Sequence, residues 1–271
     1  MVTKLRAAGC VFAEDEARLL VSTAATSADL AAMVDRRAAG LPLEHVLGWA
    51  EFCGLRIAVD PGVFVPRTRT EFLVRQAASL ALAGRRPAGS RAVVVDLCCG
   101  SGAVGAALVA ALAGAELHAV DIDPAAARCA RRNVAAVGHV YEGDLFEPLP
   151  ATLRSRVDVL VANVPYVPTE EVGLLPPEAR MHEPRSALDG GADGLDLLRR
   201  VVAEAPFWLI PGGHVLVETS ERQARRAVDA VARSGLVPQV ASSGELNAAV
   251  VIGTKPTRES GAGGRPRRPG T

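Results

Sequence analysis

The chain has few aromatic residues and no net charge, and each shortage narrows the class of protein. Phe, Trp and Tyr make up 4% of the 271 residues while hydrophobic residues make up 49%, so Ala and Val must build a large core. Thirty basic side chains balance thirty acidic ones, which removes the strong positive charge of a general nucleic-acid binder. The length fits one large domain, or one domain with a small appendage.

The cysteines and histidines form no ligand pattern. The five cysteines include no Cys-x-x-Cys, and the five histidines lack metal-ligand spacing. No apolar run is long enough to span a bilayer, and the first residues, where Lys4 and Arg6 are soon followed by three acidic residues, lack a signal-peptide pattern. The sequence therefore predicts a reduced, cytoplasmic protein without a bound metal.

The most informative stretch runs from Val93 to Gly102. Val93 to Val95 predict a buried parallel strand that stops at Asp96, and a small-residue turn then leads into a helix over residues 103–113. A strand, a glycine turn and a helix N-terminus are typical of a nucleotide-binding crevice, because the turn lets the backbone approach a ligand. The turn also matches the pattern G-x-G-x-x-G, which on its own is a weak sign of a dinucleotide site.

Three aspartates at predicted strand ends favour a different ligand. A carboxylate at Asp96 would repel a pyrophosphate but suit the ammonium and sulfonium groups of S-adenosylmethionine. Asp121 ends the predicted strand 116–121, where an acidic residue can accept both ribose hydroxyls. Asp144 follows a short strand at 140–142 and can face an adenine amine, with Leu145 covering the ring. The alternative is that these aspartates only cap helices or form turns in an ordinary α/β domain.

Residues Asn163 to Tyr166 follow a fourth predicted strand, 157–162, at the end where open α/β sheets bind ligands. We interpret them as a site for a planar amide. The Asn163 side-chain oxygen and the Val164 carbonyl would accept its two N–H groups, while Pro165 keeps Val164 extended and Tyr166 packs on the amide. Holding an amide nitrogen at attack distance would offset its poor nucleophilicity. The alternative is a plain turn after a strand.

The segments before the central stretch suggest a small appendage. Residues 1–40 predict two short helices, with Ser27 as the N-cap of the second, and they either dock a partner or only pack on the core. A hairpin is expected within 49–59 and a helix over 72–82, and the pattern allows Arg67 and Glu71 before this helix to project toward the crevice.

The segments after it continue the alternation of strand and helix. A linker-like loop is predicted for Gly84–Ser90, a long irregular loop for 167–192 and a disordered tail for 255–271. The remaining predicted elements are helices at 124–137, 194–205 and 221–234 and strands at 214–219, 237–241 and 248–252.

Taken together, the motifs resemble those of the HemK-type protein-(glutamine-N5) methyltransferases. The likeness runs from about Pro42 to Thr254, and the motifs occur in the family's order. They are Pro42–Gly48, Val65–Glu71, Asp96–Gly102, Val120–Asp121, Gly143–Asp144, Asn163–Tyr166 and Glu183–Leu188.

The resemblance implies a fold, a reaction and a set of site residues. The fold is a Rossmann-like class I methyltransferase, with a mostly parallel seven-stranded sheet and a short helical N-terminal segment. The implied divisions are 1–40, the hairpin and connection 41–90, the methyltransferase domain 91–254 and the tail 255–271. The reaction transfers a methyl group from S-adenosylmethionine to a glutamine side-chain amide, in a release factor or another translation protein. Catalysis is assigned to Asn163, Val164, Pro165 and Tyr166, and cofactor binding to Asp96, Cys98, Cys99, Gly100, Ser101, Gly102, Asp121, Ile122, Asp144, Leu145, Asn163, Arg67 and Glu71.

Three departures from the family pattern bear on these expectations. Val164 stands where the family usually has the first Pro of Asn-Pro-Pro-Tyr, as in a variant subgroup whose substrate is undefined. Cys98 and Cys99 replace residues that are commonly Gly and Thr, and the segment before Pro42 is shorter than the family's helical N-terminal domain. Two other classes remain open: an adenine-amine methyltransferase of nucleic acid, against which the neutral charge counts, and a non-catalytic cofactor-binding module.

Overall fold

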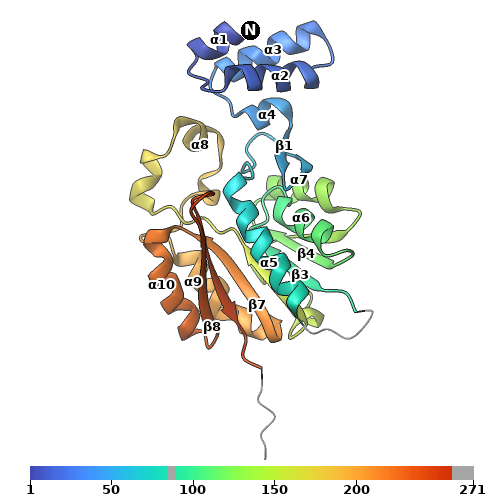
Figure 1. Ribbon diagram of the computed structural model, residues 1–271, viewed down its shortest axis with the longest axis vertical. Helices are drawn as coiled ribbons and strands as arrows, with labels where there is room; N and C mark the ends of the chain where they lie inside the picture. Colours follow the sequence, from blue (N-terminus) through green and yellow to red (C-terminus); the bar gives the residue numbers. More distant parts are fainter. Residues whose placement is uncertain (85–89, 258–271) are drawn as a thin grey trace, which may run out of the picture.

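The computed structural model describes residues 1–84 and 90–257, and Figure 1 shows how its elements are arranged. Most of the predicted linker Gly84–Ser90, and the predicted tail beyond residue 257, lie outside the described residues. Among the described helices, none combines the length and apolar character needed to cross a membrane.

The described part of the chain forms one large sheet of seven strands. Its spatial order is β5-β4-β3-β6-β7-β9-β8. β9 runs antiparallel to both of its neighbours, and the other paired strands are parallel. The predicted mostly parallel seven-stranded sheet is therefore confirmed. The strands are β3 (Val93–Leu97), β4 (Glu116–Asp121), β5 (Gly138–Glu142), β6 (Val157–Ala162), β7 (Leu209–Thr219), β8 (Val237–Ser243) and β9 (Ala248–Thr254).

Helices cover both faces of the sheet, which explains the unbroken apolar runs of its central strands. Side chains alternate between the faces, so Val94 of β3 packs in one core and Val93 and Val95 pack in the other. The first core is closed by α5 (Glu71–Ala83), α6 (Ala103–Ala111) and α7 (Pro124–Val134). The second is closed by α9 (Asp196–Trp208) and α10 (Glu221–Arg233).

The N-terminal segment contains three helices, so the prediction of two was wrong. They are α1 (Val2–Ala7), α2 (Ala13–Thr23) and α3 (Ser27–Ala38). Gly9, with φ of 90°, separates α1 from α2. Thr26, not Ser27, caps α3, because its hydroxyl accepts the Asp29 N–H at 3.1 Å. These helices share a separate small core with α4 (Leu43–Leu47).

The predicted hairpin is present as β1 (Trp49–Phe52) and β2 (Leu55–Ala58). Its turn residues Cys53 and Gly54 both have positive φ, as a two-residue hairpin turn with the twist of the strands requires. The short 3-10 helix η1 (Thr68–Thr70) then leads into α5.

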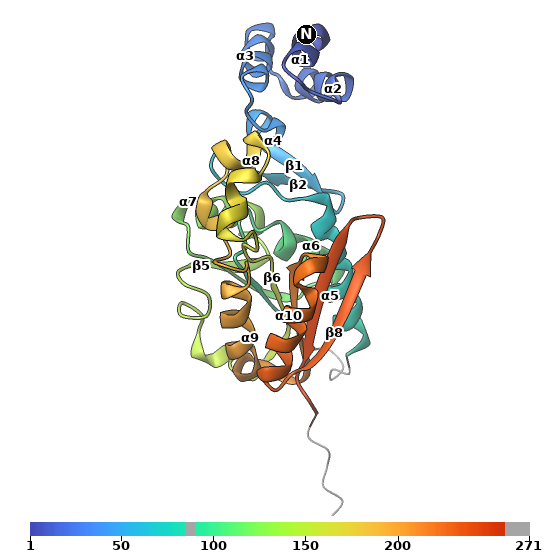
Figure 2. The same cartoon turned by 90° about the vertical axis from the view of Figure 1, so that its left-hand side faces the viewer.

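The loop predicted as irregular between 167 and 192 is only partly so. It holds the 3-10 helix η3 (Thr169–Leu174), α8 (Pro177–His182) and the 3-10 turn η4 (Arg185–Ala187). The loop folds back on itself, because Val167 pairs with Asp189. Figures 1 and 2 show α8 beside α4 and below the N-terminal helices.

Candidate active site

A cavity of about 700 Å³ lies at the carboxyl ends of β3, β4 and β6. β3 pairs with β4 on one side and with β6 on the other, so the chain changes direction across the sheet at this point. Such a switch point leaves a crevice beyond the strand ends. The loop 167–192 and the segment 63–70 complete the walls of the cavity.

Asp96 and Asp121 lie at the floor of the cavity. Asp96 is 1% exposed, and its Oδ2 accepts the Gly105 N–H of α6 at 2.8 Å. Asp121 accepts the Gly100 N–H at 2.7 Å and the Asp123 N–H at 2.9 Å. The turn after β3 is thus tied to the end of β4.

Burial changes the acidity of both carboxyls. Desolvation raises the pKa of Asp96 to about 7, and the nearby Asp121 adds to the rise. Desolvation also raises the pKa of Asp121, although its backbone hydrogen bonds oppose the rise. A cation bound beside Asp96 would therefore stabilise a charge that the fold alone stabilises poorly.

Residues after β4 and β5 form the outer part of the cavity wall. Asp144 pairs with Arg200 of α9 at 2.6 Å. Leu145 is buried with a positive φ of 47°, whereas Ile122 is 60% exposed. All three predicted residues line the cavity, and they leave an apolar surface beside a carboxylate.

The glycine turn brings most of its predicted residues to the cavity. Cys98, Cys99, Gly100 and Ser101 line it. Gly102 does not. A side chain at Gly102 would place Cβ 3.1 Å from Cβ of Ala130 in α7, so this glycine permits close packing of the turn on that helix. Burial raises the pKa of both thiols, Cys98 and Cys99, which keeps them protonated.

Residues Asn163 to Tyr166 line the same cavity from the end of β6. In the part of the chain that the structure describes, the Asn163 carboxamide has no hydrogen-bond partner, so its polar atoms are available to a ligand in the cavity. Val164 lines the cavity, but the residue as a whole is 1% exposed and its side chain packs in the core. A Pro at this position would keep the same main-chain carbonyl.

The Tyr166 ring is held by an ion pair behind it. Its hydroxyl donates to Glu218 of β7 at 3.4 Å, and Arg69 donates to the same Glu218 oxygen at 3.2 Å. The Arg69 guanidinium also lies over the Tyr166 ring, 5.6 Å from its centroid. Desolvation raises the pKa of Tyr166 to about 12, with the Glu218 charge adding to the rise, so the hydroxyl remains a donor at neutral pH.

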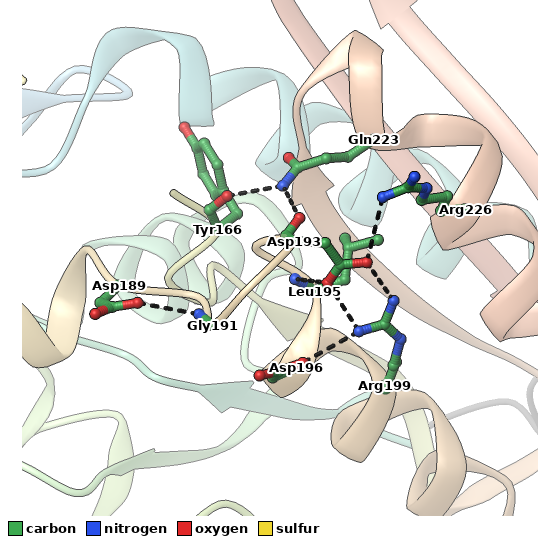
Figure 3. Close-up of polar contacts among 9 residues, drawn as sticks. All are labelled: Tyr166, Asp189, Gly191, Asp193, Leu195, Asp196, Arg199, Gln223 and Arg226. Atoms are coloured by element: carbon green, nitrogen blue, oxygen red, sulfur yellow. Dashed lines mark hydrogen bonds and ion pairs between the residues drawn. The ribbon is translucent and has the colours of Figure 1, made fainter. Parts of the chain in front are cut away.

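The backbone after Pro165 is fixed by α10 and by the loop before α9, as Figure 3 shows. Gln223 Nε2 donates to the Tyr166 carbonyl at 2.8 Å and to the Asp193 carbonyl at 2.9 Å. The Asp193 carboxylate in turn pairs with Arg199 at 2.6 Å and Arg226 at 3.6 Å. A Cβ at Gly190 would lie 2.6 Å from the Pro165 carbonyl oxygen, so this close approach requires glycine.

Arg67 and Glu71 diverge in the structure. Arg67 lines the cavity and pairs with the buried Glu183 at 2.6 Å. Glu71 is not among the cavity residues, because its carboxylate turns to the hairpin and accepts the Cys53 N–H at 3.0 Å. The predicted cofactor contact of Glu71 therefore does not fit this geometry.

Sequence reasoning missed the residues that support the site from behind. Asn133 of α7 ties the hairpin to the glycine turn, donating to the Ala58 and Ser101 carbonyls at 2.9 and 2.7 Å. Ser220 and Gln223 form a capping box, a pattern readable from the sequence. No local pattern links Gln223 to Tyr166 or Glu218 to Arg69, because these contacts join residues 57 and 149 positions apart.

The described residues contain no group of His, Cys, Asp and Glu that could hold a metal ion. The cavity is lined by the carboxylates Asp96 and Asp121 and also by the segment Asn163–Tyr166.

Comparison with solved structures places the fold among methyltransferases. A methyltransferase from Pyrococcus furiosus matches with a TM-score of 0.54 at 16% identity, over 75% of this chain and 90% of that one. A ribosomal protein L11 methylase from Lactobacillus delbrueckii subsp. bulgaricus matches with a TM-score of 0.51 at 16% identity, over 74% and 85%. The family model described as the methyltransferase small domain matches residues 55–191.

Curated relatives narrow this class to one family. The release factor glutamine methyltransferase of Geobacter sulfurreducens is 42% identical over 206 residues, covering 75% of this chain and 69% of that protein. That of Gloeobacter violaceus is 41% identical over 210 residues, covering 75% and 71%. The chain belongs to the release factor glutamine methyltransferase family, so the HemK-type resemblance of its motifs is confirmed.

Proposed function

We propose that the protein transfers a methyl group from S-adenosylmethionine to the side-chain amide nitrogen of a glutamine in a peptide chain release factor. The observation that supports this proposal most strongly is that the buried Asp96 and Asp121 line the same cavity as the Asn163–Tyr166 motif. Family membership supports the choice of acceptor, since the relatives are named for release factor glutamine methylation.

The residues at the strand ends fit S-adenosylmethionine. The cavity volume of about 700 Å³ lies within the usual range of small-molecule sites. Asp96 and the turn Cys98–Ser101 would hold the methionine part, Asp121 the ribose hydroxyls, and Asp144, Leu145 and Ile122 the adenine end. Arg67 lines the same cavity, but its guanidinium pairs with Glu183 at 2.6 Å, so we do not assign it to the cofactor.

The bound cofactor supplies the chemistry of a sulfonium-linked methyl group, and the chain supplies the position of the acceptor. Asn163 and the Val164 carbonyl would accept the two amide N–H groups, which aligns the nitrogen and favours the positive charge that develops on it. In the transfer, the amide nitrogen would gain the methyl group in place of one of its protons, which would pass to water, while Asp96, Asp121 and the turn would hold the cofactor that gives up the methyl group. Tyr166, held by Glu218 and Arg69, would pack against the amide plane.

The direct test incubates the full chain with methyl-labelled S-adenosylmethionine and purified release factor from the same source. Mass spectrometry of the digested product should place one methyl group on a glutamine side chain. A release factor with that glutamine replaced by Asn is the matched control and should stay unlabelled. Labelling of co-purified nucleic acid instead of protein would favour the adenine-amine alternative.

A calorimetric titration tests the cofactor separately. S-adenosylmethionine should bind in the micromolar range, and NAD should not bind at the same concentrations. Binding of NAD without binding of S-adenosylmethionine would instead identify the glycine turn as a dinucleotide site.

With a translation factor as substrate, the proposed reaction takes place in the cytoplasm, and it requires no metal and no membrane.

A further inference from the structure

One buried carboxylate beside the cavity has no part in the proposed reaction. Glu183 follows α8 and lines the cavity, and its side chain is 1% exposed. Its Oε1 accepts hydrogen bonds from Arg67 at 2.6 Å and from the Val65 N–H at 3.2 Å. Within the described residues, its Oε2 has no hydrogen-bond partner. Buried polar atoms are rarely left unpaired, so an unpaired one lining a cavity points to a ligand donor.

A second unpaired polar atom lies on the adjacent turn. Thr70 is 2% exposed and lines the cavity, and in the described part of the chain its hydroxyl has no partner. The Thr70 N–H donates to the Arg67 carbonyl at 2.9 Å, so Thr70 and the cation that holds Glu183 belong to one helical turn. Both residues line the cavity, and among the residues that the structure describes one carries an unpaired carboxylate oxygen while the other carries an unpaired hydroxyl.

This pair belongs to the acceptor end of the cavity. The neighbouring Arg69 lies over the Tyr166 ring, and the Arg67 and Arg69 charges both lower the pKa of Tyr166. A group that reaches Glu183 therefore comes from the molecule bound at Tyr166.

The charge balance selects the kind of donor. Arg67 already neutralises Glu183, so Oε2 requires a hydrogen bond more than a second cation. A main-chain N–H is a neutral donor, and a glutamine within a polypeptide carries such groups on both sides. We propose that Glu183 Oε2, assisted by the Thr70 hydroxyl, binds a main-chain N–H of the acceptor segment beside the target glutamine. This inference rests on the proposed function, because it assumes a polypeptide acceptor.

The first test is Glu183→Gln in the full chain. Arg67 and Val65 are both donors, so the new carboxamide keeps its oxygen toward them and turns its NH₂ group to the cavity. The carboxamide NH₂ group then faces the main-chain N–H of the acceptor, and two donors cannot form a hydrogen bond. The Michaelis constant for release factor should therefore rise about 10-fold or more. The affinity for S-adenosylmethionine should stay within about twofold. Glu170→Gln, an exposed change in the same loop, is the matched control and should alter neither value.

The second test changes the acceptor peptide and compares the parent enzyme with Glu183→Gln. Synthetic peptides carry the release factor sequence around the glutamine, and each peptide has a single backbone N–H replaced by an ester oxygen. The peptides are added as competitors of release factor methylation. One ester next to the glutamine should weaken competition about 10-fold with the parent enzyme. With Glu183→Gln the same ester should not weaken competition further, because the carboxylate that accepts the main-chain N–H is already absent.

Three results would overturn the inference. They are an unchanged Michaelis constant in folded Glu183→Gln, equal competition by all ester peptides with the parent enzyme, or a loss confined to cofactor affinity. Failure of the proposed function looks different, because the parent enzyme itself would then transfer no methyl group to release factor.

Discussion

At the scale of the residue, Asp96 carries the strongest electrostatic consequence of the fold. It is buried with one backbone hydrogen bond, whereas Asp121 accepts two such bonds at 2.7 and 2.9 Å. A buried carboxylate with few donors is poorly stabilised as an anion. A cationic ligand supplies the stabilisation of the Asp96 anion that the backbone does not. We therefore expect the protonation of Asp96, rather than that of Asp121, to affect binding of the sulfonium.

This difference predicts a pH dependence of cofactor binding. With the pKa of Asp96 raised to about 7, the carboxyl is protonated below that pH, and binding a cation must then release a proton. Affinity for S-adenosylmethionine should therefore rise as pH increases toward 7 and level off above it. Calorimetry between pH 5.5 and 8.5, with Asp96→Asn as the control, measures this. An identical pH profile for parent and Asp96→Asn would remove the role of Asp96.

Residue types at strand ends were the most predictable part of the site. Asp96, Asp121 and Asp144 could be placed because a predicted strand ends at or just before each of them, and ligands bind at the carboxyl ends of such strands. Glu71 could not be placed, because the direction of its side chain depends on the hairpin turn at Cys53, which lies 18 residues earlier. Glu183 and Glu218 stayed unassigned because their partners are distant in sequence.

At the scale of the element, the Asn163–Tyr166 turn depends on β7 and α10. β7 supplies Glu218 to the Tyr166 hydroxyl, and α10 supplies Gln223 to the Tyr166 carbonyl. Both partners come from elements that lie later in the chain. The turn after β6 is therefore shaped by tertiary contacts and not by its own sequence alone.

Glu218→Gln tests whether this support matters for turnover. Removing the charge weakens the hold on both Arg69 and the Tyr166 hydroxyl, and a hydrogen bond to a charged group typically contributes about 1.5–3 kcal/mol. We expect turnover to fall about 10-fold or more with cofactor affinity unchanged. Tyr166→Phe should lose a similar factor, and the double variant should be little worse than either single one.

If turnover in the double variant falls by the product of the two single losses, Glu218 and Tyr166 act independently. Glu171→Gln, which changes an exposed pair with Arg222, controls for a general effect of removing a carboxylate. Thermal unfolding of each variant separates loss of folded protein from loss of turnover.

At the scale of the whole molecule, the N-terminal helices are connected to the loop that borders the cavity. Arg37 of α3 pairs with the buried Glu16 at 2.7 Å and also with Glu178 of α8. Glu178 itself lines the cavity. Figure 2 shows α1–α3 as a lobe above α8. Together with α4, these helices have a small core of their own.

Deleting residues 1–40 should therefore affect the acceptor more than the cofactor. The deletion removes the partner of Glu178 but leaves the sheet, the glycine turn and the Asn163 motif intact. We expect a raised Michaelis constant for release factor, with S-adenosylmethionine affinity unchanged by calorimetry. Unchanged acceptor kinetics in a folded deletion variant would show that these helices only pack on α4.

The order of strands and helices was predictable because apolar periodicity marks it, and helices on both faces leave continuous Val and Leu runs. Boundaries were less predictable. β7 begins at Leu209 rather than His214, since it continues through Pro211 to Gly213 with an irregular register against β6. The division into segments at residues 40, 90 and 254 stays a prediction.

The central claim is that Asn163 holds the acceptor amide in line with the methyl group, and one measurement tests it most directly. Single-turnover methyl transfer to release factor should be about 100- to 1,000-fold slower in Asn163→Ala, because one preorganised polar partner of the reacting group is lost. Affinity for S-adenosylmethionine, measured in parallel, should change little because Asp96 and Asp121 remain. Val164→Pro, which keeps the carbonyl and removes only an N–H, should transfer at nearly the parent rate. Transfer by Asn163→Ala at the parent rate would contradict the account.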